Sequence, residues 1–151
     1  MLRRREREIG PVIEAVAKIV CKEAALKEAK KTAEAAGVTI SYDMGWQKWR
    51  RAMNSLSGVG HAVGAKTWKM GSYATRSKRW ATCYAAEQGN EEPPPHNCQK
   101  NFCKSSKAMD ADAIVEIAKD LKDAGVKIAV MVGDNDSSAT KNLREEGGDD
   151  I

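Results

Sequence analysis

The chain has 151 residues, a formal net charge of +4, 42% hydrophobic residues and 30% charged residues. This length suits one domain with a substantial core. No run approaches the roughly 18 apolar residues of a membrane span, which argues against an integral membrane protein. No apolar signal-peptide core follows the Arg-rich start, so we expect an intracellular protein whose 4 cysteines are reduced.

The charge is placed unevenly along the chain. Residues 1–36 carry 9 basic and 6 acidic side chains, residues 37–108 carry 11 and 4, and residues 109–151 carry 5 and 11. A basic middle beside an acidic end suits a surface that meets a polyanion next to a site that collects metal. Ordinary charge scatter on a solvated surface gives the same counts, so charge alone leaves both interpretations open.

Residues 1–36 are predicted to form an N-terminal helical segment. Apolar residues between Ile9 and Val20 recur near helical spacing, and Gly37 follows as the stop. Pro11 is expected to sit in a first turn or to break a preceding one. We expect this helix to pack on the domain that follows, or on a segment outside this chain.

From Gly37 onward the pattern changes and predicts an α/β domain over residues 37–151. The expected elements are strands at 38–43, 57–65 and 67–75, an irregular insertion at about 76–107, a helix at 110–125, a strand at 127–132 and a helix at 137–146. Three consecutive short strands suggest an antiparallel meander. A strand that returns after a crossover helix is the βαβ pattern of a mixed sheet.

Two of the predicted strands end in an acid. Asp43 closes the first strand, Asp134 directly follows the strand at 127–132, and Asp136 lies just beyond it. Carboxylate oxygens are the ligands that Mg²⁺ or Mn²⁺ prefers, so these acids predict a divalent-metal site. For Asp134 and Asp136, an Asx turn and a helix N-cap are the structural alternative.

An ordered set of motifs resembles the Mutator-like transposase domain of animal mobile elements, a DDE enzyme with a ribonuclease H-like fold. The blocks that carry the resemblance are Ile40-Ser41-Tyr42-Asp43-Met44-Gly45-Trp46-Gln47-Lys48, Asn54-Ser55-Leu56-Ser57-Gly58, Arg76-Ser77-Lys78, His96-Asn97-Cys98-Gln99-Lys100-Asn101, Ser105-Ser106-Lys107-Ala108-Met109-Asp110, Val132-Gly133-Asp134-Asn135-Asp136-Ser137-Ser138 and Leu143-Arg144-Glu145-Glu146. The resemblance runs from about Gly37 to the end of the chain.

The resemblance implies an enzyme that cuts and joins DNA at transposon ends in the nucleus, and it allows a homo-oligomer. It assigns Asp43 and Asp134 to a two-metal site, in which one Mg²⁺ or Mn²⁺ activates a water or a DNA 3′-hydroxyl and the other stabilises the leaving oxygen. Asp136 becomes a helix cap or an outer ligand. The third acid, on a helix after a fifth strand, has no counterpart before Ile151. We therefore expect an incomplete sheet and a truncated chain that is inactive alone.

The insertion at about 76–107 departs from the family pattern. The resemblance implies a Cys-x-x-Cys pair followed by His-x-Cys, a ligand set that suits tetrahedral Zn²⁺. Trp80 stands where the first Cys would be, while Cys83, His96 and Cys98 remain. Cys103 is the candidate replacement ligand, and free buried thiols are the alternative to a metal site.

Basic side chains in the middle of the chain are candidates for sequence-independent phosphate contacts. They are Lys48, Arg50, Arg51, Arg76, Lys78 and Arg79. A rival hypothesis is a non-catalytic, transposon-derived DNA-binding or interaction fragment, which keeps the basic surface and the zinc ligands without the chemistry. A haloacid-dehalogenase-like phosphatase is disfavoured, because Asp43-Met44-Gly45 does not supply an Asp-x-Asp nucleophile.

Overall fold

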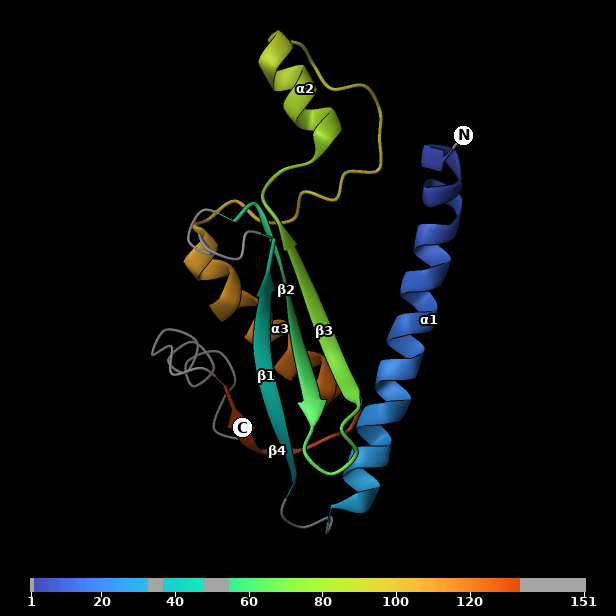
Figure 1. Cartoon of the computed structure of the whole chain (residues 1–151), viewed down its shortest axis with the longest axis vertical. Coiled ribbons are helices and arrows are strands. Elements are labelled where there is room, and N and C mark those ends of the chain that lie inside the picture. Colours follow the sequence, from blue (N-terminus) through green and yellow to red (C-terminus); the bar gives the residue numbers. More distant parts are fainter. Residues whose placement is uncertain (1, 33–36, 48–54, 134–151) are drawn as a thin grey trace.

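The computed structural model describes residues 2–32, 37–47 and 55–133 (Figure 1). The elements are α1 (Leu2–Lys31), β1 (Val38–Trp46), β2 (Ser57–Gly64), β3 (Met70–Ser77), α2 (Ala81–Gly89), α3 (Ser106–Asp123) and β4 (Ile128–Val132). The strands form one four-stranded sheet in the order β3-β2-β1-β4. β1 and β3 pair antiparallel with β2, and β4 pairs parallel with β1. The predicted mixed sheet with an N-terminal helix is confirmed, and the helix expected at 137–146 lies outside the described residues.

β1 has one buried and one exposed face, as its alternating sequence requires. Ile40, Tyr42 and Met44 are buried, while Ser41 and Asp43 are exposed. α3 covers the buried face and supplies the largest fully buried side chains of the core, among them Met109, Ile117 and Leu121. The opposite face of the sheet, which we call the outer face, therefore carries the side chain of Asp43.

α3 begins at Ser106, before the expected start at Asp110. Ser105 is the N-cap, and its hydroxyl accepts a hydrogen bond from the Ala108 N–H at 3.3 Å. Ser is among the preferred N-caps because its oxygen satisfies a free helix donor. The predicted stop at Gly125 is confirmed: its φ is +77°, and its N–H donates to the Lys122 carbonyl at 2.8 Å.

α1 lies along the β3 edge of the sheet and continues without interruption through Pro11 (Figure 1). The prediction that Pro11 starts or breaks a helix is wrong; the helix only loses the hydrogen bond that the missing N–H would have made. Cys21, Ala24 and Ala25 are buried, whereas Val16 is 54% exposed. Among residues 8–31 of α1, whose side chains the structure describes, the buried ones therefore lie in the C-terminal half of the helix.

Glu28 joins α1 to the turn between β2 and β3. Its side chain is 2% exposed, and its two carboxylate oxygens accept the N–H groups of Lys66 and Thr67, each at 2.7 Å. A Cβ at Gly64 would collide with this carboxylate, so glycine leaves the space that Glu28 occupies. Burial raises the pKa of Glu28, but hydrogen bonds from Thr67 and Lys66 outweigh it and hold the pKa below its ordinary value.

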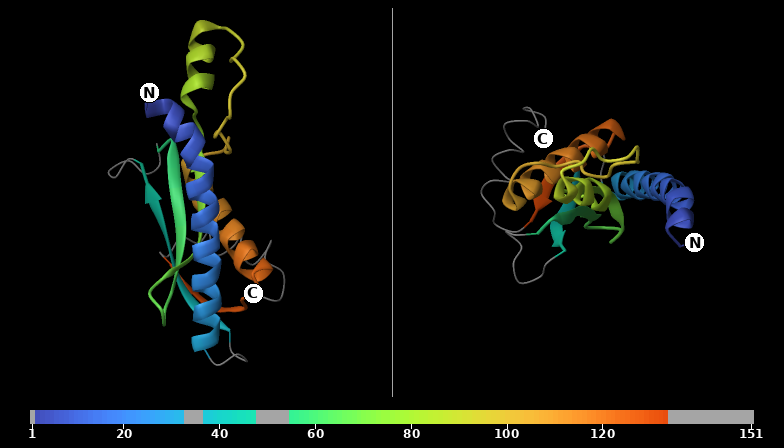
Figure 2. Two further views of the ribbon diagram at one scale, coloured as in Figure 1. Left: turned by 90° about the vertical axis from the view of Figure 1, so that its right-hand side faces the viewer. Right: turned by 90° about the horizontal axis from the view of Figure 1, so that it is seen from above.

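The insertion contains a helix that its sequence did not predict. α2 spans 9 residues, and its C-cap is Asn90, whose φ of 52° is left-handed. The segment carrying α2 extends beyond the end of the sheet in two perpendicular views (Figures 1 and 2). At its base, Asn101 ties the returning chain to β3, because its amide donates to the Thr75 carbonyl at 2.9 Å and accepts the Ser77 N–H at 2.7 Å.

Within the part of the chain that the structure describes, none of the helices combines the length and apolar character that crossing a membrane requires.

Candidate metal sites

Three of the predicted zinc ligands come together in the insertion. Cys83 lies on α2, and its Sγ is 3.1 Å from the Nε2 of His96 and 3.4 Å from the Sγ of Cys98. The three ligand atoms all lie within 4.8 Å of one another. Two sulfurs bound to one tetrahedral Zn²⁺ at about 2.3 Å would be roughly 3.8 Å apart. Small movements of these side chains therefore suffice to enclose such an ion.

The orientation of His96 also suits a metal ligand. Its Nδ1 lies 2.7 Å from the Pro94 carbonyl oxygen, which can only accept, so Nδ1 carries the proton. In neutral imidazole this leaves the lone pair of Nε2 directed at the cysteines. Metal-binding histidines use this arrangement, since a backbone carbonyl on the second nitrogen fixes the tautomer.

The two thiols differ in their readiness to ionise. The Lys100 backbone N–H, together with Cys83 and His96, lowers the pKa of Cys98. The hydrogen bond with Cys98 raises the pKa of Cys83. The thiolate is the form that binds metal. Cys98 therefore ionises more readily than Cys83 and is the better prepared sulfur ligand of the two.

The fourth predicted ligand is not part of this group. Among the described residues, the cluster contains Cys83, His96 and Cys98 but not Cys103, which is exposed. Trp80, at the position of the missing first Cys, is the N-cap residue of α2 and is 36% exposed. The residues present fit a three-ligand zinc site with one open position.

Asp43 is exposed on the outer face of β1. The prediction that Asp43 closes the first strand is wrong, because β1 continues to Trp46 and Asp43 lies within it. In the antiparallel register Asp43 lies directly opposite His61 of β2. The C-terminal end of β4 reaches the same region, because a Cβ built on Gly133 would lie 3.4 Å from the Tyr42 carbonyl oxygen. The next residue along the chain, Asp134, lies outside the described residues, as does Asp136.

Beneath Asp43, the neighbouring Tyr42 is fixed to α3. Its hydroxyl donates to the Asp110 carboxylate at 2.6 Å, on the core side of the sheet. Burial, followed by the hydrogen bond to Asp110, raises the pKa of Tyr42. The backbone that carries Asp43 is therefore held against α3 by its adjacent residue.

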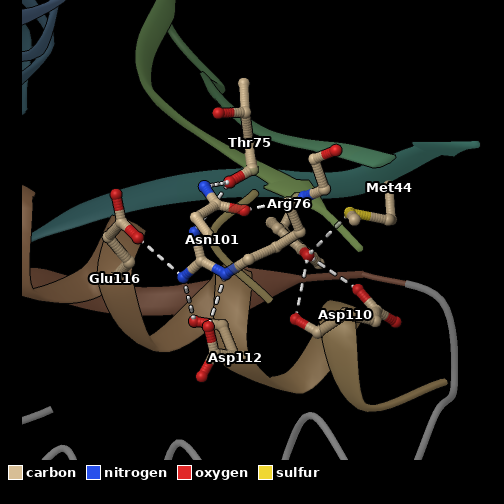
Figure 3. Close-up of polar contacts among 9 residues, drawn as sticks. Met44, Thr75, Arg76, Asn101, Asp110, Asp112 and Glu116 are labelled. Atoms are coloured by element: carbon tan, nitrogen blue, oxygen red, sulfur yellow. Dashed lines mark hydrogen bonds and ion pairs between the residues drawn. The ribbon is translucent and has the colours of Figure 1, made fainter. Parts of the chain in front are cut away.

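Arg76 is a buried cation that joins β3 to α3 (Figure 3). The sequence predicted a DNA contact for this residue and not a structural role. Arg76 of β3 is 7% exposed; its guanidinium is paired with Asp112 and lies 2.6 Å from Glu116 of α3. A DNA phosphate would bind the N–H groups of this guanidinium, but Asp112 and Glu116 already accept them. This argues against the prediction that Arg76 contacts DNA. Arg76 follows Ser72 and Ala74 of β3 at intervals of two residues, and this spacing places all three on the same, core-facing side of the strand.

The other predicted DNA contacts are placed differently. Lys78 is half-buried and donates to the Ser106 hydroxyl at 2.8 Å. Arg79 is exposed and its guanidinium lies 3.0 Å from the centre of the Tyr84 ring, a cation–π contact. Lys48, Arg50 and Arg51 lie outside the described residues.

Comparison with known proteins agrees with the motif pattern. Neither a curated protein nor a solved structure matches the chain. A family model described as Mutator-like transposase matches residues 1–149, almost the whole sequence. This chain therefore belongs to the Mutator-like transposase family.

Proposed function

We propose that this chain forms part of a DDE-type, ribonuclease H-like transposase core, whose activity is divalent-metal-dependent cleavage and transfer of DNA strands. Membership of the Mutator-like transposase family supports this proposal. The sheet supports it too, since three antiparallel strands followed by a strand that returns parallel form the mixed sheet expected from the sequence.

The observation that carries the proposal is the parallel pairing of β1 with β4. Ser41 of β1 is paired with Val132 of β4, and Asp43 follows Ser41 by two residues within β1. Asp134 follows Val132 by the same two residues in the sequence. Continuation of this parallel register beyond Val132 would bring the two acids side by side, which is why we assign them to one site.

The chemistry of these residues fits Mg²⁺ or Mn²⁺. Asp43 is an exposed carboxylate, and Asp134 supplies a second one. A pair of such ions, when bound, would activate the attacking oxygen and stabilise the leaving oxygen of a phosphodiester. Asp43 and Asp134 would hold the ions, with Asp136 as an outer ligand, and Tyr42 would keep the β1 backbone in position.

DNA is the partner that this function requires, and the nucleus is the compartment in which we place it. Within the described residues, Arg79 is exposed at the base of α2, where it could contact a phosphate. Lys78 is its neighbour, and Lys48, Arg50 and Arg51 remain candidates from the sequence. Contacts of this kind would give affinity without sequence specificity.

Calorimetric titration with Mn²⁺ tests the proposal. The wild-type chain should bind, and Asp43→Asn and Asp134→Asn should each weaken binding at least about tenfold, since each removes a charged ligand. Asp123→Asn, at the C-terminal end of α3, is the matched control that removes the same charge and should change nothing. Mn²⁺ binding that survives both Asp43→Asn and Asp134→Asn would refute the assignment.

A second candidate is a non-catalytic DNA-binding or interaction module. It is favoured by the assembly of Cys83, His96 and Cys98 in the insertion. The segment that carries α2 extends beyond the end of the sheet (Figure 1). Under this alternative, Asp43→Asn combined with Asp134→Asn leaves DNA affinity and Mn²⁺ affinity unchanged, while removal of Zn²⁺ lowers DNA affinity. The metal-dependent proposal requires Mn²⁺ affinity to fall in the same variant.

A further inference from the structure

The turn between β2 and β3 exposes a tryptophan. Trp68 is 82% exposed, the largest exposed fraction among the large apolar side chains that the structure describes. The turn lies at the end of the sheet opposite the segment that carries α2 (Figure 1). A single exposed apolar residue is ordinary on a protein surface, so exposure alone assigns no role to Trp68. Its backbone supplies a second observation.

The backbone of Trp68 is left-handed, with a φ of +56°. Glycine and asparagine adopt this conformation readily, whereas a bulky side chain rarely does, because its Cβ approaches the carbonyl oxygen. Among the described residues other than glycine, Asn90 alone shares a positive φ. Backbone preference therefore disfavours tryptophan at position 68, and burial does not compensate. Residues held in such conformations collect at functional sites.

Hydrogen bonds hold the turn in this conformation. The Trp68 N–H donates to the Gly64 carbonyl at 2.9 Å, and the Gly64 N–H donates to the Lys69 carbonyl at 3.0 Å. The carboxylate of Glu28 on α1 accepts two further N–H groups of the turn, each at 2.7 Å. The backbone that carries the ring is thus fixed from two directions, so little of it has to be ordered when the ring binds a partner.

Lysines accompany the exposed ring. Lys66 and Lys69 flank it in the turn and are exposed, and the adjacent last turn of α1 adds Lys30 and Lys31. The hairpin from Ser57 to Ser77 contains no acidic residue. A partner that combines negative charge with flat apolar faces is complementary to this surface. Single-stranded nucleic acid combines the two, because its phosphates alternate with base rings that an aromatic side chain can stack on.

We propose that the turn between β2 and β3 is a DNA contact, in which the Trp68 ring stacks on an unpaired base and Lys66 and Lys69 bind the neighbouring phosphates. The choice of DNA rests on the proposed function, and the inference deepens that function by naming a single-stranded segment as the form bound. A membrane surface also accepts tryptophan beside lysine. However, Ala65 and Thr67, the other residues of the turn, add too little apolar surface to hold it in a bilayer.

Fluorescence anisotropy with two labelled probes of equal length tests the stacking. One probe is oligothymidine, and the other is an abasic oligomer that keeps the phosphates without the bases. The wild-type chain should bind oligothymidine at least about fivefold more tightly than the abasic probe, as expected for stacking on one base. Trp68→Ala should remove this preference and leave the affinity for the abasic probe unchanged, while Trp68→Phe keeps a flat ring and should retain part of the preference.

The lysines are tested with the same probes. Lys66→Gln combined with Lys69→Gln should lower the affinity for both probes and weaken its dependence on salt concentration, because fewer counterions are released on binding. Lys22→Gln combined with Lys122→Gln removes the same charge from exposed positions on α1 and α3 and is the matched control. This control variant should bind both probes like the wild type.

Trp68→Asn separates a binding role from a structural one. Asparagine tolerates the left-handed conformation, so this variant should unfold at the same urea concentration as the wild type or a higher one, while it loses the preference for oligothymidine. A lower unfolding midpoint would show that the ring contributes to packing and would overturn the proposal. So would a preference for oligothymidine that survives Trp68→Ala.

Two further results would also overturn the DNA contact. One is a wild-type chain that binds neither probe, and the other is Trp68-dependent binding to vesicles of anionic phospholipid without a response to oligothymidine. Neither result affects the proposed metal chemistry, because none of the turn residues is a proposed ligand of Mg²⁺, Mn²⁺ or Zn²⁺. The Mn²⁺ titration of Asp43→Asn tests that chemistry separately.

Discussion

The Nε2 of His96 lies 3.1 Å from the Sγ of Cys83, although 13 positions separate the two residues in the sequence. The intervening chain forms the rest of α2, reverses at Asn90 and returns through three prolines. Pro94 then holds the His96 ring by its carbonyl oxygen. A helix and a stiff return segment thus bring a nitrogen and a sulfur ligand together.

This contact leads to a prediction about zinc affinity. Cys83→Ser, Cys98→Ser and His96→Ala should each weaken Zn²⁺ binding by more than about tenfold, because even loss of a residue that only orients a ligand costs that much. Cys103→Ser should have no effect, since Cys103 is not part of the group. Competition with a chromophoric chelator measures all four. Equal losses for Cys103→Ser and the other variants would contradict the three-ligand site.

Trp80→Cys should tighten zinc binding. Position 80 is the N-cap of α2, one helical turn before Cys83, and a thiol there can fill the open fourth position. Ala81→Cys adds the same thiol at the next, exposed position and serves as the control. Chelator competition should give a lower dissociation constant for Trp80→Cys alone, and equal affinity in both variants would show that the fourth position is not at residue 80.

Glu28→Gln should destabilise the fold by about 1–3 kcal/mol, because it removes a buried charged acceptor of two backbone hydrogen bonds. Since the pKa of Glu28 is lowered in the folded state, its contribution is complete above the ordinary value of 4.5 and is lost as the pH falls below it. Urea unfolding at pH 3 to 7 should show the gap between wild type and variant closing on the acid side. Glu23→Gln, an exposed change on the same helix, should leave the unfolding free energy unchanged, and a pH-independent gap would contradict the account.

Asp112→Asn combined with Glu116→Gln should destabilise the fold, since the change leaves the buried Arg76 cation without an acid partner. The two carboxylates are 48% and 45% exposed, so water compensates in part and we expect about 1–3 kcal/mol rather than the larger cost of a fully buried pair. Chemical unfolding measures the loss. Asp123→Asn, an exposed position on α3, is the control for charge on this helix, and a loss as large in that variant would point to general charge effects.

The strands and α3 could be predicted from the sequence because their patterns depend on local chemistry. Alternation in β1 and the stop at Gly125 are such cases. α2 was missed because it is short, contains Cys83 and is followed by three prolines and two further cysteines, which suggest irregular structure. The helix formers Ala85 and Ala86, followed by Gly89 and Asn90, were the available signal.

Contacts between distant segments could not be predicted from local patterns. The hydrogen bonds from the turn between β2 and β3 to Glu28 depend on where α1 packs, and the buried state of Arg76 depends on its acid partners in α3. For the zinc group, the sequence identified the ligands by residue type but not the exclusion of Cys103, which depends on the path of the chain after Cys98. Asp43 was found on an exposed strand face, while the prediction for Asp134 remains a prediction.

The most direct test of the central claim is to locate bound Mn²⁺ by its broadening of backbone amide NMR signals. If Asp43 of β1 and the chain that follows β4 form the divalent-metal site, Mn²⁺ should broaden the signals of Asp43, Met44 and Gly133 first, and Asp43→Asn should abolish this effect. Broadening that begins elsewhere, or that persists unchanged in Asp43→Asn, would contradict the assignment of Asp43 and Asp134 to a transposase metal site.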